Sequence, residues 1–134
     1  MTWRVTCTGG LITNCEHISS GTSFVTDAPS DNNGLGQVFS RTDTVAIGLA
    51  GCMITMMGIK ADNLDLDFTN TTAEVTKHMS ANPRQISKIE VLLKLPSLVS
   101  EKNRTIVEHT ANTSPVLYSL HPDIEKVINF NWEL

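Results

Sequence analysis

The chain has few cysteines, no excess of basic charge and no metal-binding pattern. Its three cysteines, Cys7, Cys15 and Cys52, are an odd number without a CxxC spacing. This argues against a disulfide framework and against a structural zinc site. Ten basic residues against fourteen acidic ones give a net charge of -4, so nothing indicates binding to nucleic acid or to an anionic membrane. The four histidines are widely spaced, and we expect no bound metal and no other cofactor.

Long hydrophobic segments are also missing. The first fifteen residues are polar and mixed, which predicts no signal peptide. The most apolar run, residues 44–59, falls short of the ~20 residues that a membrane span needs. We therefore expect a cytoplasmic protein, and free cysteines fit a reducing compartment. A length of 134 residues predicts one domain, residues 1–134.

Apolar periodicity and turn formers predict an α+β fold with mostly antiparallel strands in the order βββ-α-ββ-α-α-β. The expected strands are residues 2–8, 11–18, 23–26, 71–79, 85–95 and 125–132, and the expected helices are residues 40–61, 100–113 and a short one from 114. A two-residue turn at Gly9 and Gly10 would place Cys7 opposite Ile12. Cys7 and Cys15 would then lie on opposite faces of the hairpin.

The helix expected at residues 40–61 carries the most informative pattern. Ser40 and Asp43 nearly match a capping box. Gly48, Gly51 and Gly58 interrupt the apolar run, and each glycine inside a helix costs about 1 kcal/mol relative to alanine. Close approach by another backbone is the usual reason for such glycines. This pattern predicts an outside contact on the helix beside a lone thiol.

Cys52 itself has two interpretations. Free cysteine is among the most buried residue types, so Cys52 can be a small core residue. A reactive thiol needs a cation and some exposure. No lysine, arginine or histidine lies within one helical turn of Cys52 in the sequence. Activation would therefore have to come from elsewhere in the fold or from another chain.

Four segments together resemble the OsmC-like family, which includes the organic hydroperoxide resistance proteins. They are residues 26–53, 74–86, 114–116 and 119–124, and the resemblance covers nearly the whole chain. It implies an OsmC-like α+β fold with a long central helix. It also implies an intertwined homodimer in which the long helices of two chains pack together, with the reactive cysteine near the interface.

The resemblance also implies a set of site residues. In the peroxidase members, one cysteine attacks the peroxide and a second cysteine resolves the sulfenic acid as a disulfide. Cys52 matches the first cysteine, whereas Ser114 stands at the position of the second and cannot form a disulfide. The arginine expected in the first hairpin turn is missing. Thr42 stands at the position of the catalytic glutamate, Asp43 matches the acidic position of other branches, and Arg41 replaces a proline.

These observations predict a one-cysteine thiol peroxidase that reduces organic hydroperoxides in an oxidative stress response. Cys52 would react, Asp43, Arg41 and Ser114 would complete the site, and an external thiol or dithiol would be the reductant. The activating cation would be Arg41 or a group from the partner chain. Two alternatives stay open: a family member that binds a small apolar or lipid-like ligand at the dimer interface without turnover, and a stress-related structural protein. The sequence assigns no role to Cys7 and Cys15.

Overall fold

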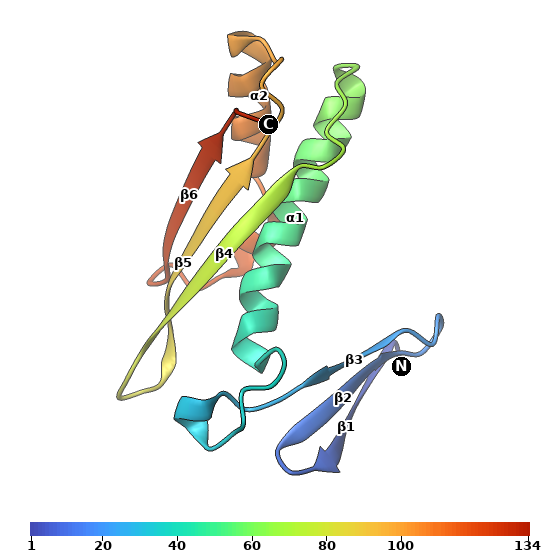
Figure 1. The fold of residues 1–134 in the computed structure, drawn as a ribbon, viewed down its shortest axis with the longest axis vertical. Helices are drawn as coiled ribbons and strands as arrows, with labels where there is room; N and C mark the ends of the chain where they lie inside the picture. Colours follow the sequence, from blue (N-terminus) through green and yellow to red (C-terminus); the bar gives the residue numbers. More distant parts are fainter. The chain divides into compact units, whose positions relative to one another are not determined.

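The structure is a computed structural model that describes all residues from 1 to 134. The chain divides into two compact units, Met1–Val45 and Ala46–Leu134, and each is described by itself. The order of strands and α-helices is the predicted one, with one additional 3-10 helix at Ser30–Asn32 (Figure 1).

The first unit is a three-stranded antiparallel sheet followed by a loop. The sheet consists of β1 (Trp3–Gly9), β2 (Ile12–His17) and β3 (Ser23–Thr26), in that order. The loop is closed at its base, because the Asp27 amide donates to the Phe39 carbonyl over 2.9 Å and the Gly36 amide donates to the Ala28 carbonyl over 3.2 Å. The loop is therefore folded back on itself before α1 begins.

The first hairpin differs from the prediction. Its turn is Gly10 and Leu11, both with positive φ (61° and 67°), and the register shifts between Cys7 and Gly9. Cys7 consequently pairs with Thr13 and not with Ile12. Residues directly opposite in an antiparallel pair share a face, as do residues two apart on one strand. Cys7 and Cys15 therefore lie on the same face of the sheet, and the prediction of opposite faces is wrong.

Leu11 is a residue that the hairpin turn tolerates at a cost. A non-glycine residue in the left-handed region is strained by about 1–2 kcal/mol, and Leu11 has φ 67° with a half-exposed side chain. Replacing Leu11 with glycine should relieve this strain and raise the free energy of unfolding by about 0.5–1 kcal/mol, after the larger entropy loss of glycine. Chemical denaturation measures this change. Unchanged or lower stability would show that the Leu11 side chain compensates for its backbone.

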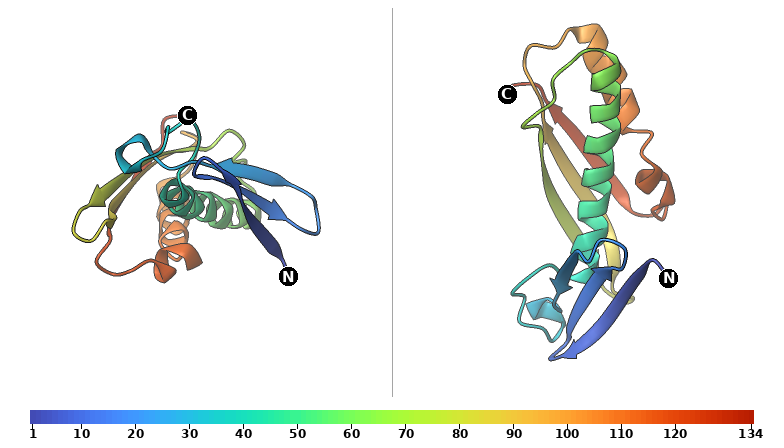
Figure 2. Two further views of the ribbon diagram at one scale, coloured as in Figure 1. Left: turned by 90° about the horizontal axis from the view of Figure 1, so that it is seen from below. Right: turned by 90° about the vertical axis from the view of Figure 1, so that its right-hand side faces the viewer.

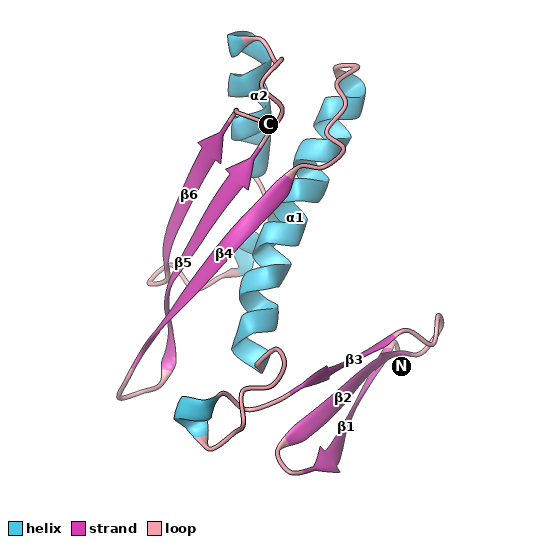
Figure 3. Cartoon of the chain, viewed as in Figure 1, coloured by secondary structure: helices cyan, strands magenta, loops and turns pink.

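The second unit contains a mixed three-stranded sheet with helices (Figure 3). β4 (Thr72–Ser80) pairs antiparallel with β5 (Gln85–Lys94), and β5 pairs parallel with β6 (Glu125–Asn131). The parallel pairing follows from the connection, because α2 (Glu101–Ala111) and α3 (Pro115–Ser119) carry the chain back before β6 begins. Three of the four strand pairings in the two sheets are antiparallel, so the sheets are mostly antiparallel as predicted.

The core of the second unit lies between its sheet and its helices. α1 (Arg41–Asn63) runs along the sheet, and α2 lies on the same side (Figure 2). Alternate residues of β5 point to this side, and the fully buried members include Ile89, Val91 and Leu93. The register of β4 and β5 shifts between His78 and Met79. This bulge explains the interruption of the apolar alternation near Lys88, since one extra residue turns the following side chains to the other face.

α1 is long and apolar enough to cross a membrane by length and composition alone. The helix is 23 residues long, close to the helix predicted at residues 40–61 and longer than the apolar run within it. A core helix of a soluble protein meets the same criteria, and one such helix is weak evidence for a span. Only 33% of its most apolar window is buried within the chain, which leaves much of its surface without a covering partner.

Candidate functional site

Cys52 lies on the open side of α1. Apart from Ile47 and the helix ends, the exposed residues of this helix recur every three or four positions, so they form one stripe along it. The stripe consists of Val45, Gly48, Gly51, Thr55 and Ile59. Gly48 and Thr55 are four residues before and three residues after Cys52. The half-buried Cys52 therefore sits within the stripe, and it is absent from the buried residues on the opposite side of α1.

The glycines leave this stripe open. A Cβ atom placed on Gly48 or Gly51 would meet no atom of the chain within 4 Å. The fold of one chain therefore gives no reason for glycine at either position. The helix accepts their conformational cost of about 1 kcal/mol each without gaining an internal contact. A requirement from outside the chain remains as the explanation.

The sulfur of Cys52 has no hydrogen-bond or ion-pair partner within the chain. The thiolate is the nucleophilic form of cysteine, and it needs a nearby positive charge or donor to be well populated at neutral pH. Within one chain, no positive charge or hydrogen-bond donor is paired with the Cys52 sulfur. A cation for this thiol would have to approach from outside or after a rearrangement.

Arg41, the cation proposed from the sequence, is engaged in the first unit. Its Nη2 donates to the carbonyl of Leu11 over 2.9 Å, in the turn of the first hairpin. The guanidinium thus ties the start of α1 to that turn. Its role as an activating group stays a prediction. The guanidinium keeps further N–H donors for such a role.

Asp43 and Ser40 form the capping box expected at the start of α1. The Ser40 amide donates to the Asp43 carboxylate over 2.8 Å, and the Asp43 amide donates to the Ser40 hydroxyl over 3.0 Å. This reciprocal pair satisfies two backbone donors and starts the helix at Arg41. The structure gives Asp43 a structural task, and its predicted catalytic role is untested.

Ser114 is fully buried and caps α3. Its hydroxyl accepts from the Leu117 amide over 3.4 Å, and Pro115 occupies the first helical turn. The short helix predicted from residue 114 therefore begins at Pro115. No hydrogen bond joins Ser114 to Cys52, so the assignment of Ser114 to the resolving position also stays a prediction.

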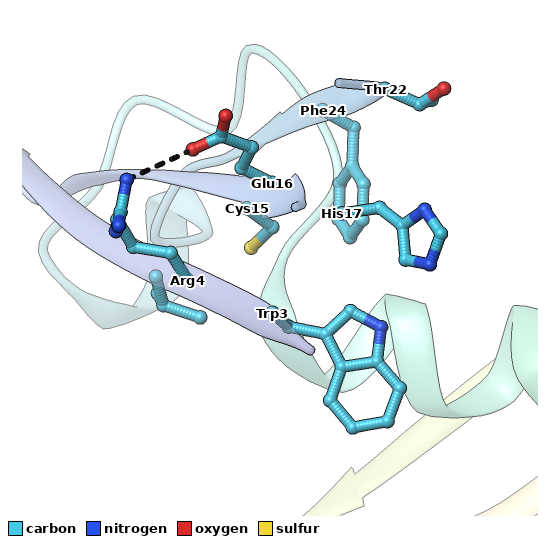
Figure 4. A pocket seen from close by; sticks show the side chains of 8 residues that line it. Trp3, Arg4, Cys15, Glu16, His17, Thr22 and Phe24 are labelled. Atoms are coloured by element: carbon cyan, nitrogen blue, oxygen red, sulfur yellow. Dashed lines mark ion pairs between the residues drawn. The ribbon is translucent and has the colours of Figure 1, made fainter. Parts of the chain in front are cut away.

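The N-terminal sheet carries a separate apolar hollow of about 390 Å³. Figure 4 shows Trp3, Cys15 and Phe24 around it, with the Arg4–Glu16 ion pair drawn as a dashed line. Trp3 is 70% exposed and Phe24 is 49% exposed. These fractions are unusual for large aromatic side chains on one sheet face, and such a patch marks an interaction surface. Cys15 is therefore part of an uncovered apolar face.

A second hollow, of about 410 Å³, lies between α1 and α2 and was missed by sequence reasoning. Its lining residues are Met56, Ile59, Lys60, Asn63, His109, Thr110 and Thr113. Lys60 follows Cys52 by two helical turns, and His109 lies on α2. The sequence shows no signal that α1 and α2 meet here, because their contact depends on the tertiary fold.

Comparison of the sequence with protein-family models and with curated proteins gave no match. Solved structures do match. A crystal structure from Psychrobacter arcticus, provisionally described as an osmotic stress induced and detoxification response protein, is 42% identical. The match covers 97% of this chain and 95% of that chain, with a TM-score of 0.93.

Two more distant structures share the fold. An organic hydroperoxide resistance protein OsmC from Legionella pneumophila is 13% identical, with a TM-score of 0.76 over 98% of this chain and 97% of that chain. An OsmC-like protein from Mycoplasma pneumoniae is 14% identical, with a TM-score of 0.81 over 98% of this chain and 96% of that chain.

The structure is an α+β fold with a long apolar helix that carries a half-buried thiol. Together with the matching structures, these features place the chain in a class of protein. The chain belongs to the OsmC-like family. The family resemblance predicted from the sequence is thereby confirmed.

Proposed function

We propose that this protein is a one-cysteine thiol peroxidase that reduces organic hydroperoxides, with Cys52 as the attacking residue. The observation that carries the proposal is the position of Cys52 on the open, glycine-lined stripe of α1. A core cysteine would lie among the buried residues on the other side of the helix. Membership of a family that includes a hydroperoxide resistance protein supports the same chemistry.

The proposed reaction has three steps. The Cys52 thiolate attacks one oxygen of the hydroperoxide, so that a sulfur–oxygen bond forms, the O–O bond breaks and the alcohol leaves with a proton. The product on the protein is a sulfenic acid. An external thiol then attacks the sulfenic sulfur and releases water, and a second thiol displaces Cys52 from the mixed disulfide. The two reductant thiols end as a disulfide, and Cys52 returns to its reduced form.

The direct test uses one equivalent of cumene hydroperoxide. We expect a sulfenic acid at Cys52, which a dimedone adduct found by peptide mass spectrometry would record. Neither Cys7 nor Cys15 should give this adduct at comparable yield. An absence of the adduct at Cys52, with the peroxide unconsumed, would overturn the proposal.

We further propose that the protein acts as a homodimer in the cytoplasm. Two uncovered apolar surfaces support the dimer, namely the stripe on α1 and the face of the N-terminal sheet around Trp3 and Phe24. A second copy of the chain carries the same two apolar surfaces, so each copy can cover surfaces of the other. Asp43 and Arg41 would contribute to the site, Arg41 or a partner cation would activate Cys52, and residues 1–134 would act as one domain. Three free cysteines fit a reducing compartment.

A second function is favoured by a specific observation. The sulfur of Cys52 lacks a partner within the chain, and an unactivated thiol beside an apolar surface suits a binding protein. Such a protein would hold a small apolar or lipid-like ligand at the dimer interface without turnover. A bound ligand together with an inert Cys52 would select this function over the peroxidase.

Ser114 allows a separate prediction. If its hydroxyl only caps α3, Ser114→Ala should lower the free energy of unfolding by about 1 kcal/mol and leave the reactivity of Cys52 unchanged. Chemical denaturation and peroxide consumption measure the two effects. A loss of activity at normal stability would give Ser114 a catalytic role.

The variant Ser114→Cys tests the geometry of the same position. We expect it to form a disulfide with Cys52 after peroxide treatment, because Ser114 stands where the family's peroxidases carry their resolving cysteine. Non-reducing peptide mapping detects this crosslink. Its absence, while Cys52 itself becomes oxidised, would contradict the assignment of Ser114 to the resolving position.

A further inference from the structure

We propose that the hollow between α1 and α2 binds the carboxylate head of an apolar acid whose hydrocarbon body runs along α1 toward Cys52. The hollow measures about 410 Å³, within the range of small-molecule sites. Met56 and Ile59 form part of its apolar wall, and Lys60 and His109 are its charged or chargeable members. The inference deepens the proposed function, because it names a substrate class for the same thiol.

The lining has the charge pattern of an anion site. Lys60 supplies a permanent positive charge and His109 a second donor, whereas no aspartate or glutamate lines the hollow. Of the remaining polar members, the Thr110 and Thr113 hydroxyls already donate to the carbonyls of Ile106 and Thr110, and the side-chain amide of Asn63 is a neutral donor. A single carboxylate would meet its opposite charge there without a competing acid.

Neither of these two side chains is used elsewhere in the fold. The side chains of Lys60 and His109 make no hydrogen bond and no ion pair, although several other lysines of the chain are paired. Lys60 is half-buried despite this. An unpaired ammonium held at the edge of an apolar wall is available to a ligand.

The obvious structural explanation for both side chains is their place near helix ends. Each lies in the last turn of its helix, where the unpaired carbonyls favour a positive charge. Those carbonyls are partly satisfied by backbone amides here. The backbone amide of Leu64 donates to the carbonyls of Lys60 and Ala61. The backbone amide of Asn112 donates to the carbonyls of Glu108 and Thr110. The bonded carbonyls attract the two side chains less, which leaves their charge for a ligand.

The hollow shares a helix face with the thiol. Met56 and Ile59 follow Cys52 by four and seven residues, and these spacings place all three on one face of α1. Lys60 lies about 12 Å from Cys52 along the helix axis at 1.5 Å per residue. An apolar acid held by its carboxylate at Lys60 would therefore extend along Ile59 and Met56 toward the sulfur.

The experiment compares octanoate with its uncharged counterpart octanamide by titration calorimetry on the full-length protein. We expect octanoate to bind about tenfold more tightly, the effect of one charge-assisted hydrogen bond. Lys60→Met keeps the apolar stem of the side chain and should remove this preference while leaving octanamide binding unchanged. Lys102→Met, on the exposed surface of α2 and outside the hollow, should leave both affinities unchanged.

Three results would overturn the inference: equal affinity for the two probes, no binding of either at millimolar concentration, or Lys60→Met weakening both probes equally. The last result would show a structural role for Lys60. The proposed function fails separately. If the wild-type protein consumes no hydroperoxide but prefers octanoate in both the wild-type and Cys52→Ser forms, the peroxidase proposal is wrong and the anion site stands. If hydroperoxide is consumed without that preference, the anion site is wrong.

Discussion

Replacing Cys52 with serine should reduce thiol-dependent hydroperoxide consumption to the rate measured without protein. Serine cannot be oxidised to a sulfenic acid, so no other group of the site can take over the first step. Cys7 and Cys15 remain in this variant, and it therefore also tests whether any thiol of the chain suffices. The matched control is the double variant Cys7→Ser and Cys15→Ser, which should retain the wild-type rate.

The reactivity of Cys52 can also be measured without choosing a hydroperoxide substrate. Alkylation by iodoacetamide at pH 7, followed by peptide mass spectrometry, should label Cys52 faster than Cys15 and faster than Cys7. The comparison with Cys7 is demanding, because Cys7 is exposed and Cys52 is half-buried. Faster labelling of the less accessible thiol requires an activating group. If Cys52 is the slowest of the three, the binding-protein function replaces the peroxidase.

Placing leucine at Gly48 should break the proposed dimer. Overpacking an interface costs about 1–3 kcal/mol per site, and a twofold interface contains the substitution twice. The dissociation constant should therefore rise by about thirtyfold or more. Within one chain, the position has room for a Cβ atom, since nothing lies within 4 Å of one. Sedimentation velocity at micromolar concentration measures the effect.

Two controls separate assembly from folding. Thr105→Leu places the same side chain on the exposed surface of α2 and should not change the sedimentation of the protein. Gly48→Ala should raise the stability of an isolated chain by about 1 kcal/mol but lower the stability of a dimer that needs the notch. We expect the wild-type interface to bury more than roughly 2,000 Å², as obligate interfaces do. A folded wild-type monomer at micromolar concentration would refute the dimer.

Local chemistry explains what could be predicted from the sequence. The start of α1 follows from the Ser40–Asp43 pair, and the start of α3 follows from Ser114 and Pro115. Both depend on residues within one turn of each other. The strand β5 follows from its alternating apolar residues, and even its interruption near Lys88 corresponds to a bulge.

Features that depend on distant partners could not be predicted in the same way. The hairpin register was wrong because Leu11 adopts a left-handed backbone, which sequence reasoning reserves for glycine and asparagine. The parallel pairing of β5 with β6 depends on how α2 and α3 return the chain. The hollow at Lys60 and His109 joins residues from two helices. No short-range pattern in the sequence predicts the contact between these two helices.

Because Cys52 lies within the open stripe of α1, its reactivity should depend on the concentration of the protein. A thiol beside a surface that a second copy covers is less accessible in the dimer than in a separate chain, and the dimer fraction depends on the total concentration. In the proposed dimer, diluting the protein would therefore change the labelling rate of Cys52. Cys52 would then report the assembly of the protein as well as the presence of an oxidant.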